Sequence, residues 1–113
     1  MPGSRSSLSD DGGARLVNDM VIGVCTLTLD IPHSDSLKDK RQVVKSVIAR
    51  VRNQFNVSIA EVDANDVWQS AVIGIVCVSN DPARAHALLE KIVSMIGHSR
   101  LDAQVADYEI EMI

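Results

Sequence analysis

The chain has 113 residues, 23% of them charged, and a formal net charge of −4. This length limits it to a single domain, with a core large enough to fold without disulfides or metals. The negative total does not favour nucleic acid or an anionic membrane as a partner of the whole surface. No apolar segment is long enough to span a bilayer or placed to act as a signal peptide, so we expect a cytoplasmic protein without a membrane partner.

The charges are unevenly distributed along the chain. Ser36–Phe55 holds six of the eleven Lys and Arg residues and a single acid, Asp39. The local charge of this segment is therefore +5, which leaves about −9 for the rest of the chain. Charge that is segregated in this way is more informative about function than the net charge.

Residues 1–19 are rich in Ser, Gly and Asp and hold few large apolar side chains. Such a segment cannot bury enough apolar surface to offset the entropy of ordering it. We therefore expect a disordered arm over residues 1–19 and one domain over residues 20–113. An alternative start at Met20 and an expression-tag remnant are both compatible with this composition.

The first expected elements are a strand and a basic helix. Val21–Ile31 is rich in β-branched residues and ends at Pro32, which predicts a strand. Ser36 is a candidate N-cap, with Asp39 three residues later as a variant of the capping box. The apolar residues up to Phe55 then recur with helical spacing. They are Leu37, Val44, Val47, Ile48, Val51 and Phe55.

The second half of the chain predicts two strands, a helix and a last strand. The strands are Val57–Asp63 and Ser70–Ser79, with a turn at residues 64–66. Asp81 followed by Pro82 is typical of a helix start, because Asp caps and Pro favours the first helical position. The helix is expected to run to about Ile96.

The end of this helix and the last strand follow from two further patterns. Gly97 is expected to end the helix in a left-handed conformation. Ser99–Asp102 is a connection, and Ala103–Met112 alternates polar and apolar residues as a strand does.

The resulting order, βαββαβ, predicts an α+β protein with the ferredoxin-like fold: an antiparallel four-stranded sheet with two helices on one face. The first and third strands are expected in the centre, because they are near-continuous apolar runs. The second and fourth strands are expected at the edges, where charge prevents unwanted strand pairing. Their acids are Glu61, Asp63, Asp107, Glu109 and Glu111.

The third strand is apolar on both faces, although helices are expected to cover only one. Ala71, Ile73, Ile75 and Cys77 alternate with Val72, Val76 and Val78. An exposed apolar patch usually marks an interface, so we expect a homo-oligomer that buries the open sheet face. A monomer with a few exposed valines is the alternative.

The sequence shows no catalytic constellation. It lacks the GxGxxG, GxxxxGK[ST] and GxSxG motifs. The three histidines lie on different elements without metal-ligand spacing, and the last of them is placed to interact with a helix C-terminus. They are His33, His86 and His98. We expect no enzymatic activity, no cofactor and no metal.

Three smaller features have alternative interpretations. Cys25 and Cys77 lie in apolar runs and are interpreted as buried free thiols, with a disulfide as the alternative. The acids of the last strand are interpreted as a solvated edge rather than a paired-carboxylate site. Trp68 is expected to pack beside the third strand, with stacking on a partner as the alternative.

At about 100° per residue, Lys38, Arg41, Lys45 and Arg52 fall within one sector of roughly 60° beside the apolar face of the helix. We call these four residues the basic stripe. Lys40 lies nearer the apolar face, where its stem would be buried and its ammonium would extend past the edge. The stripe is either a solvated helix face or, together with Lys40, a phosphate-binding site for RNA. RNA recognition on the open sheet is disfavoured, because the chain has only three aromatic residues.

Four segments carry a family resemblance that covers the chain from Val21 to the C-terminus. They are SLKDKR at Ser36–Arg41, NVSIAEV at Asn56–Val62, the pattern D-x-W-Q at residues 66–69, and VSND at Val78–Asp81. Together they resemble the YlxP family, small bacterial proteins classed as a domain of unknown function. That family often has His where this chain has Asp35, so a ligand role for that His does not carry over.

The resemblance implies a ferredoxin-like fold and a link to the ribosome, because family members are often encoded among translation and ribosome-maturation factors. Its recurrent residues here are Ser36, Leu37, Lys38, Lys40 and Arg41, which either have a function or serve the helix start. The leading hypothesis is a non-enzymatic accessory factor that binds RNA or the ribosome through the basic helix face. The alternatives are a small-ligand-binding regulatory dimer of ferredoxin-like units and an enzyme whose site forms only at an oligomer interface.

Overall fold

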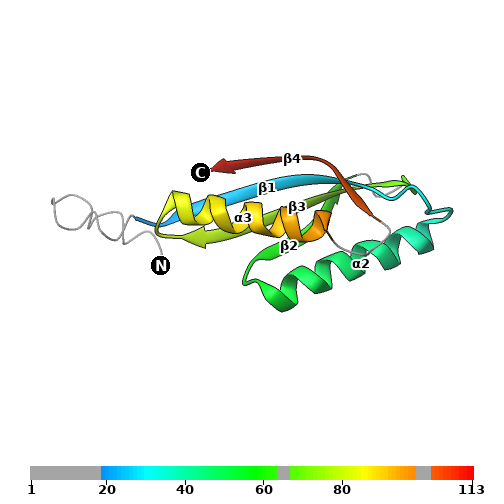
Figure 1. The fold of residues 1–113 in the computed structure, drawn as a ribbon, viewed down its shortest axis with the longest axis horizontal. Helices are drawn as coiled ribbons and strands as arrows, with labels where there is room; N and C mark the ends of the chain where they lie inside the picture. Colours follow the sequence, from blue (N-terminus) through cyan, green and yellow to red (C-terminus); the bar gives the residue numbers. More distant parts are fainter. Residues whose placement is uncertain (1–18, 64–66, 99–102) are drawn as a thin grey trace.

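The computed structural model describes residues 19–63, 67–98 and 103–113. Its elements are β1 Val21–Asp30, α2 Leu37–Gln54, β2 Ser58–Asp63, β3 Ser70–Ser79, α3 Pro82–Gly97 and β4 Gln104–Met112 (Figure 1). This βαββαβ order confirms the predicted α+β, ferredoxin-like fold. The predicted disordered arm, apart from Asp19, and the predicted connections at residues 64–66 and 99–102 lie outside the described residues.

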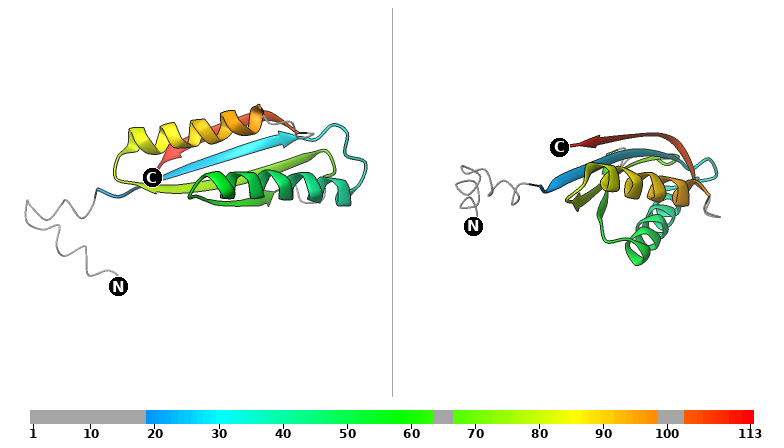
Figure 2. Two further views of the ribbon diagram at one scale, coloured as in Figure 1. Left: turned by 60° about the horizontal axis from the view of Figure 1, so that its bottom comes forward. Right: turned by 60° about the vertical axis from the view of Figure 1, so that its left-hand side comes forward.

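The four strands form one antiparallel sheet in the order β2-β3-β1-β4. The two central strands are β1 and β3, as their apolar sequences predicted, and the acid-bearing β2 and β4 lie at the edges. Both helices lie on the same face of this sheet (Figure 2). No helix in the described part of the chain is long and apolar enough to cross a membrane.

The core lies between the sheet and the two helices. Alternate residues of the central strands point into it and are inaccessible to solvent. They are Cys25, Leu27, Leu29, Ala71, Ile73 and Ile75. From the other side, α3 packs over β1, β3 and β4 with Leu89 and Ile92, while α2 covers β2. The apolar stripe of each helix thus determines which face it turns to the sheet.

The opposite face of the sheet is open in the described structure. Val76 and Val78 of β3 point to this face and are 37% and 64% exposed. On β4, the acids lie opposite the alternate β1 residues that also face away from the helices. These acids, exposed on the open face, are Asp107, Glu109 and Glu111, and we call them the acidic row. The sequence pattern therefore correctly identified β3 as apolar on both faces and the acids of β4 as exposed.

The C-terminus of α3 differs from its prediction. Gly97 is the last helical residue and does not have the left-handed φ expected of it. His98 follows with φ −98° and ψ 7°, and its backbone N–H donates to the Ser94 carbonyl. The His98 Nδ1 also donates to this carbonyl, at 2.8 Å. A helix end closed by these bonds does not require a left-handed glycine.

Both cysteines are free and buried, as predicted. Burial raises the pKa of the Cys25 thiol to about 11, with a smaller contribution from the Glu90 carboxylate. Cys25 is therefore protonated at neutral pH and packs as an apolar side chain.

Candidate nucleic-acid interface

The candidate interface is built on α2, whose start is fixed by side-chain hydrogen bonds. Ser36 is the N-cap, as predicted, and its Oγ accepts the backbone N–H of Asp39 at 3.1 Å. Asp39 Oδ2 in turn accepts the backbone N–H of Asp35 at 3.4 Å, one residue before the position that a regular capping box would use. Ser34 is buried, and its hydroxyl donates to the Ser36 carbonyl at 3.0 Å.

Two carboxyl groups interact at this helix start. A side-chain hydrogen bond from Asp35 lowers the pKa of Asp39, and the Asp35 backbone N–H lowers it further. The same side-chain hydrogen bond, together with the charge of Asp39, raises the pKa of Asp35. Asp39 is therefore the member of the pair that carries the negative charge as the pH falls.

The structure exposes Lys38, Arg41 and Lys45 on α2. The fourth residue of the basic stripe, Arg52, is also exposed, but its guanidinium donates to the carbonyl of Ile59 at 3.3 Å. Ile59 lies on the edge strand β2, so Arg52 covers part of that edge as well as adding positive charge. The first three residues of the stripe are thus the most available to an anionic partner.

Lys40 corrects the predicted site. Its side chain is only 1% exposed, and its Nζ lies 3.1 Å from Oε2 of Glu61 on β2. The prediction that the ammonium extends past the edge of the helix is wrong, and from this position Lys40 does not reach a phosphate in solvent. Glu61 lies on an edge strand, as predicted, but its side chain faces α2 and is only 21% exposed.

A groove runs beside this ion pair, between α2 and β2. It has a volume of about 320 Å³ and is lined by the apolar Val44 and Ile48 and by the charged Arg41, Lys45 and Glu61. The groove brings two residues of the basic stripe to one depression. This volume is at the lower end of the range for small-ligand sites, roughly 300–1,000 Å³.

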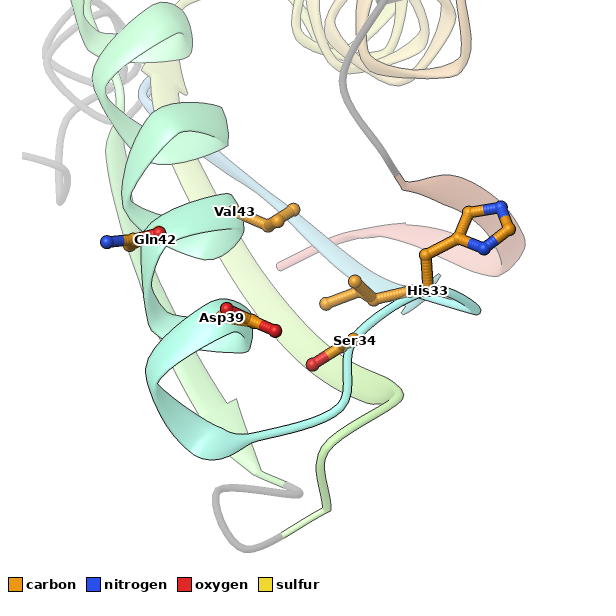
Figure 3. A pocket seen from close by; sticks show the side chains of 6 residues that line it. His33, Ser34, Asp39, Gln42 and Val43 are labelled. Atoms are coloured by element: carbon orange, nitrogen blue, oxygen red, sulfur yellow. The ribbon is translucent and has the colours of Figure 1, made fainter.

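A second hollow, of about 280 Å³, lies at the N-terminal end of α2. His33, Ser34 and Asp39 line it, and these are residue types that nucleophilic catalysis uses. Figure 3 shows Ser34 and Asp39 pointing towards each other, whereas His33 points away from both. The Ser34 hydroxyl donates to a backbone carbonyl, so these three side chains do not form a catalytic relay.

The turn before β3 is tied to this end of α2. Ile31 N–H donates to the Gln69 carbonyl at 2.9 Å, and Gln69 Nε2 donates to the Ser34 carbonyl at 3.3 Å. The neighbouring Trp68 is 51% exposed. Trp68 is thus more exposed than the expected packing beside β3 implies. Gln69, the last residue of the D-x-W-Q pattern, joins this turn to the loop that leads into α2.

The comparisons with known proteins identify a family but no activity. The sequence profile described as "Protein of unknown function (DUF503)" matches residues 22–110. The uncharacterized protein YlxP of Bacillus subtilis (strain 168) is 37% identical over 76 residues, which cover 67% of this chain and 83% of that protein. The de novo designed protein Foldit4 has a similar fold, with a TM-score of 0.50 at 13% identity over 83% of this chain and 96% of its own. On the profile match and the YlxP identity, the chain belongs to the DUF503 family of proteins of unknown function.

Proposed function

We propose that the protein is a non-enzymatic accessory factor that binds ribosomal RNA through the basic stripe of α2. The observation that carries this proposal is the separation of charge across the sheet. The exposed Lys38, Arg41 and Lys45 lie on the helix that covers β2, whereas the acidic row lies on β4 at the opposite edge. A phosphate backbone approaching α2 therefore meets positive charge without crossing the acidic row.

The ribosome enters the proposal through the resemblance to the YlxP family, whose members are often encoded among translation factors. The three exposed residues of the basic stripe would each contact a phosphate. For three contacts to a single strand, the slope of log K against log salt is expected to be about −2. Binding that is measured at one salt concentration would not distinguish such contacts from other interactions.

The test is co-sedimentation with bacterial ribosomal subunits at low and moderate salt. The test variant is Lys38→Glu/Arg41→Glu/Lys45→Glu, and all three positions are exposed. The matched control is Arg50→Glu/Arg84→Glu/Lys91→Glu, which changes the net charge equally at exposed positions outside the stripe. We expect salt-sensitive binding of the wild type and the control and loss of binding in the test variant. No binding of the wild type, or equal loss in both variants, would contradict the proposal.

We also propose that two or more copies associate through the open sheet face. Val62, Val76, Val78 and Ile113 are exposed large apolar residues at or near this face, which favours an interface. Light scattering after size exclusion tests it: Val78→Asp is expected to reduce the mass to that of one chain, and Ala87→Asp on exposed α3 surface is not. A wild type that is already monomeric at high concentration would contradict association.

The small-ligand regulatory dimer is the alternative function, and it depends on this association. Such a dimer predicts ligand-dependent thermal stabilisation that does not vary with salt. RNA binding through the stripe predicts a strong salt dependence instead.

A further inference from the structure

We infer that Trp68 stacks on an unpaired base of the RNA, next to the N-terminal end of the basic stripe. This inference rests on the proposed function and specifies the form of RNA that is bound. The stripe supplies contacts to the backbone, which every RNA offers, whereas a stacking tryptophan requires a base with a free face. The preferred ligand is therefore a single-stranded segment rather than a duplex.

The first observation is the exposure of an aromatic ring at this particular place. The chain has one Trp, one Tyr and one Phe. Phe55 packs against the core, and the Tyr108 hydroxyl on β4 donates to Glu90 at 3.0 Å, close to the acidic row. Trp68 is 51% exposed and immediately precedes Gln69, whose side chain bonds to the loop before the basic helix. An exposed tryptophan loses apolar hydration when a flat partner covers it.

The second observation is that Gln69 ties the turn that holds Trp68 to the loop before α2. Gln69, the next residue, accepts a hydrogen bond from Ile31 N–H at 2.9 Å. Its side chain donates to the carbonyls of Ser34 and Pro32 at 3.3 and 3.5 Å. The start of β3 and the start of α2 consequently lie at the same end of the molecule (Figure 1). A ring on an anchored turn loses little conformational freedom when it stacks.

The third observation concerns the path from Trp68 to the charges. The loop that Gln69 binds runs through Ser34 to Ser36, which caps α2. Lys38 lies in the first turn of that helix, and Arg41 follows one turn later. A strand whose phosphates lie along the stripe can therefore place its next bases at the turn before β3. Stacking tolerates any base, because every base has a π face.

The experiment uses the full-length wild type and its own fluorescence, since Trp68 is the only tryptophan. Three RNA probes of equal length are titrated: a mixed-sequence single strand, an abasic single strand and a duplex. Anisotropy of a dye on the RNA reports binding, and tryptophan quenching reports stacking. We expect quenching with the base-bearing single strand, and binding without quenching for the abasic strand and the duplex.

Two variants separate stacking from structure. Trp68→Ala is expected to weaken binding of the single strand about tenfold or more while leaving the duplex affinity unchanged, and Trp68→Phe to restore most of the loss. Val67→Ala, at a neighbouring exposed residue, is the matched control and is expected to bind as the wild type does. Because Trp68 is half exposed, its removal leaves the core intact, which thermal unfolding verifies.

The outcomes distinguish the inference from the function on which it rests. RNA that binds in a salt-sensitive, stripe-dependent way without quenching, or equally to Trp68→Ala, overturns the stacking role and leaves the proposed function standing. If none of the three probes binds, both the stacking role and the proposed function are overturned. Capture of a protein partner that depends on Trp68, with no effect on RNA affinity, also overturns the stacking role.

Discussion

Lys40 Nζ lies 3.1 Å from Glu61 Oε2, and this ion pair fastens the basic helix to the edge strand of the sheet. Solvent does not reach this carboxylate oxygen, and Lys40 is 1% exposed. The pair lies on the side of α2 that faces β2, and Arg52 makes a second tie from the same helix to the carbonyl of Ile59. Lys40 and Arg52 thus hold α2 against β2, and the same helix presents Lys38, Arg41 and Lys45 to solvent.

Lys40→Met is expected to lower the free energy of unfolding by about 2–4 kcal/mol. The substitution keeps an apolar stem but leaves the shielded oxygen of Glu61 without its cation. The expected loss is below that of a fully buried pair because Glu61 is 21% exposed. Urea denaturation measures it, with Lys38→Met as the control on the exposed face of the same helix, expected within about 0.5 kcal/mol of wild type.

The double variant Lys40→Met/Glu61→Leu distinguishes the charge from the packing. With both charges removed, most of the lost stability is expected to return, because a well-packed apolar pair often replaces a buried ion pair without cost. A double variant that is no more stable than Lys40→Met would show that the pair does not account for the loss.

Ser36→Ala is expected to destabilise the protein by about 1 kcal/mol. The substitution removes the acceptor of the Asp39 N–H at the start of α2. Ser36→Asn retains an acceptor and is expected to restore most of the loss. Ser46→Ala, in the exposed middle of the same helix, is the control and is expected to be neutral or slightly stabilising. Equal effects at residues 36 and 46 in thermal unfolding would contradict a capping role.

The sequence predicted the fold well because each element had a local signal. The near-continuous apolar runs of β1 and β3 reflect burial between other strands, and the acids of β4 reflect an exposed edge. Ser36 and Asp81 correctly predicted the two helix starts, and each accepts the expected capping hydrogen bond. Several element ends differ from the prediction by one residue. At Gly97 the conformation differs as well, because bonds from His98 to Ser94 close the helix without a left-handed residue.

The site was predicted less completely, because its details depend on contacts between elements. Helical periodicity placed Lys40 near the apolar face but gave no indication that Glu61 of β2 would lie against it. Alternation along β2 puts Glu61 on the same face as Ile59. Packing α2 on that face of β2 could therefore have suggested that Lys40 lies against this carboxylate. The exposure of Trp68 depends on the turn that Gln69 anchors, and sequence proximity to a buried strand indicated the opposite.

The pair Asp35 and Asp39 predicts two distinct carboxyl titrations. The pKa of Asp35 is expected above its ordinary value and that of Asp39 below, and NMR of the side-chain carboxyls measures both. In Asp35→Ala the pKa of Asp39 should rise, because its largest stabilising hydrogen bond is lost. It should still remain below the ordinary value, because the backbone N–H of residue 35 persists. An unchanged Asp39 titration in this variant would contradict the interaction.

The signs of the two shifts determine how the pair affects stability with pH. The lowered pKa of Asp39 stabilises the fold above its unfolded pKa, and this contribution is lost as the pH falls through the folded value. The raised pKa of Asp35 acts in the opposite way: its contribution is present below its unfolded pKa and is lost as the pH rises through the folded value. Asp35→Ala is therefore expected to lose the contribution that is present at acid pH, and urea midpoints measured across the acid range test this.

Two glycines on the central strands are expected to respond to alanine with opposite signs. At Gly23, an added Cβ would lie 3.0 Å from Leu89 Cδ1, 3.1 Å from Cys77 Sγ and 3.2 Å from Met112 Cε. Leu89 and Cys77 belong to the buried core and have little room to move. Gly23→Ala is therefore expected to lower the free energy of unfolding by about 1–3 kcal/mol through overpacking.

At Gly74 the added Cβ would meet the side chain of Val62, at 3.1 Å from its Cγ1. Val62 is 58% exposed on the open face, so its side chain can move away. Alanine also has less conformational entropy to lose on folding than glycine, which favours Gly74→Ala by up to about 1 kcal/mol. Urea denaturation of the two variants compares them directly, and a Gly23→Ala protein as stable as Gly74→Ala would contradict the close packing of β1 against α3. Because Gly74 lies on the face proposed for self-association, its variant must be measured at a protein concentration where the wild type and the variant have the same mass, so that only folding is compared.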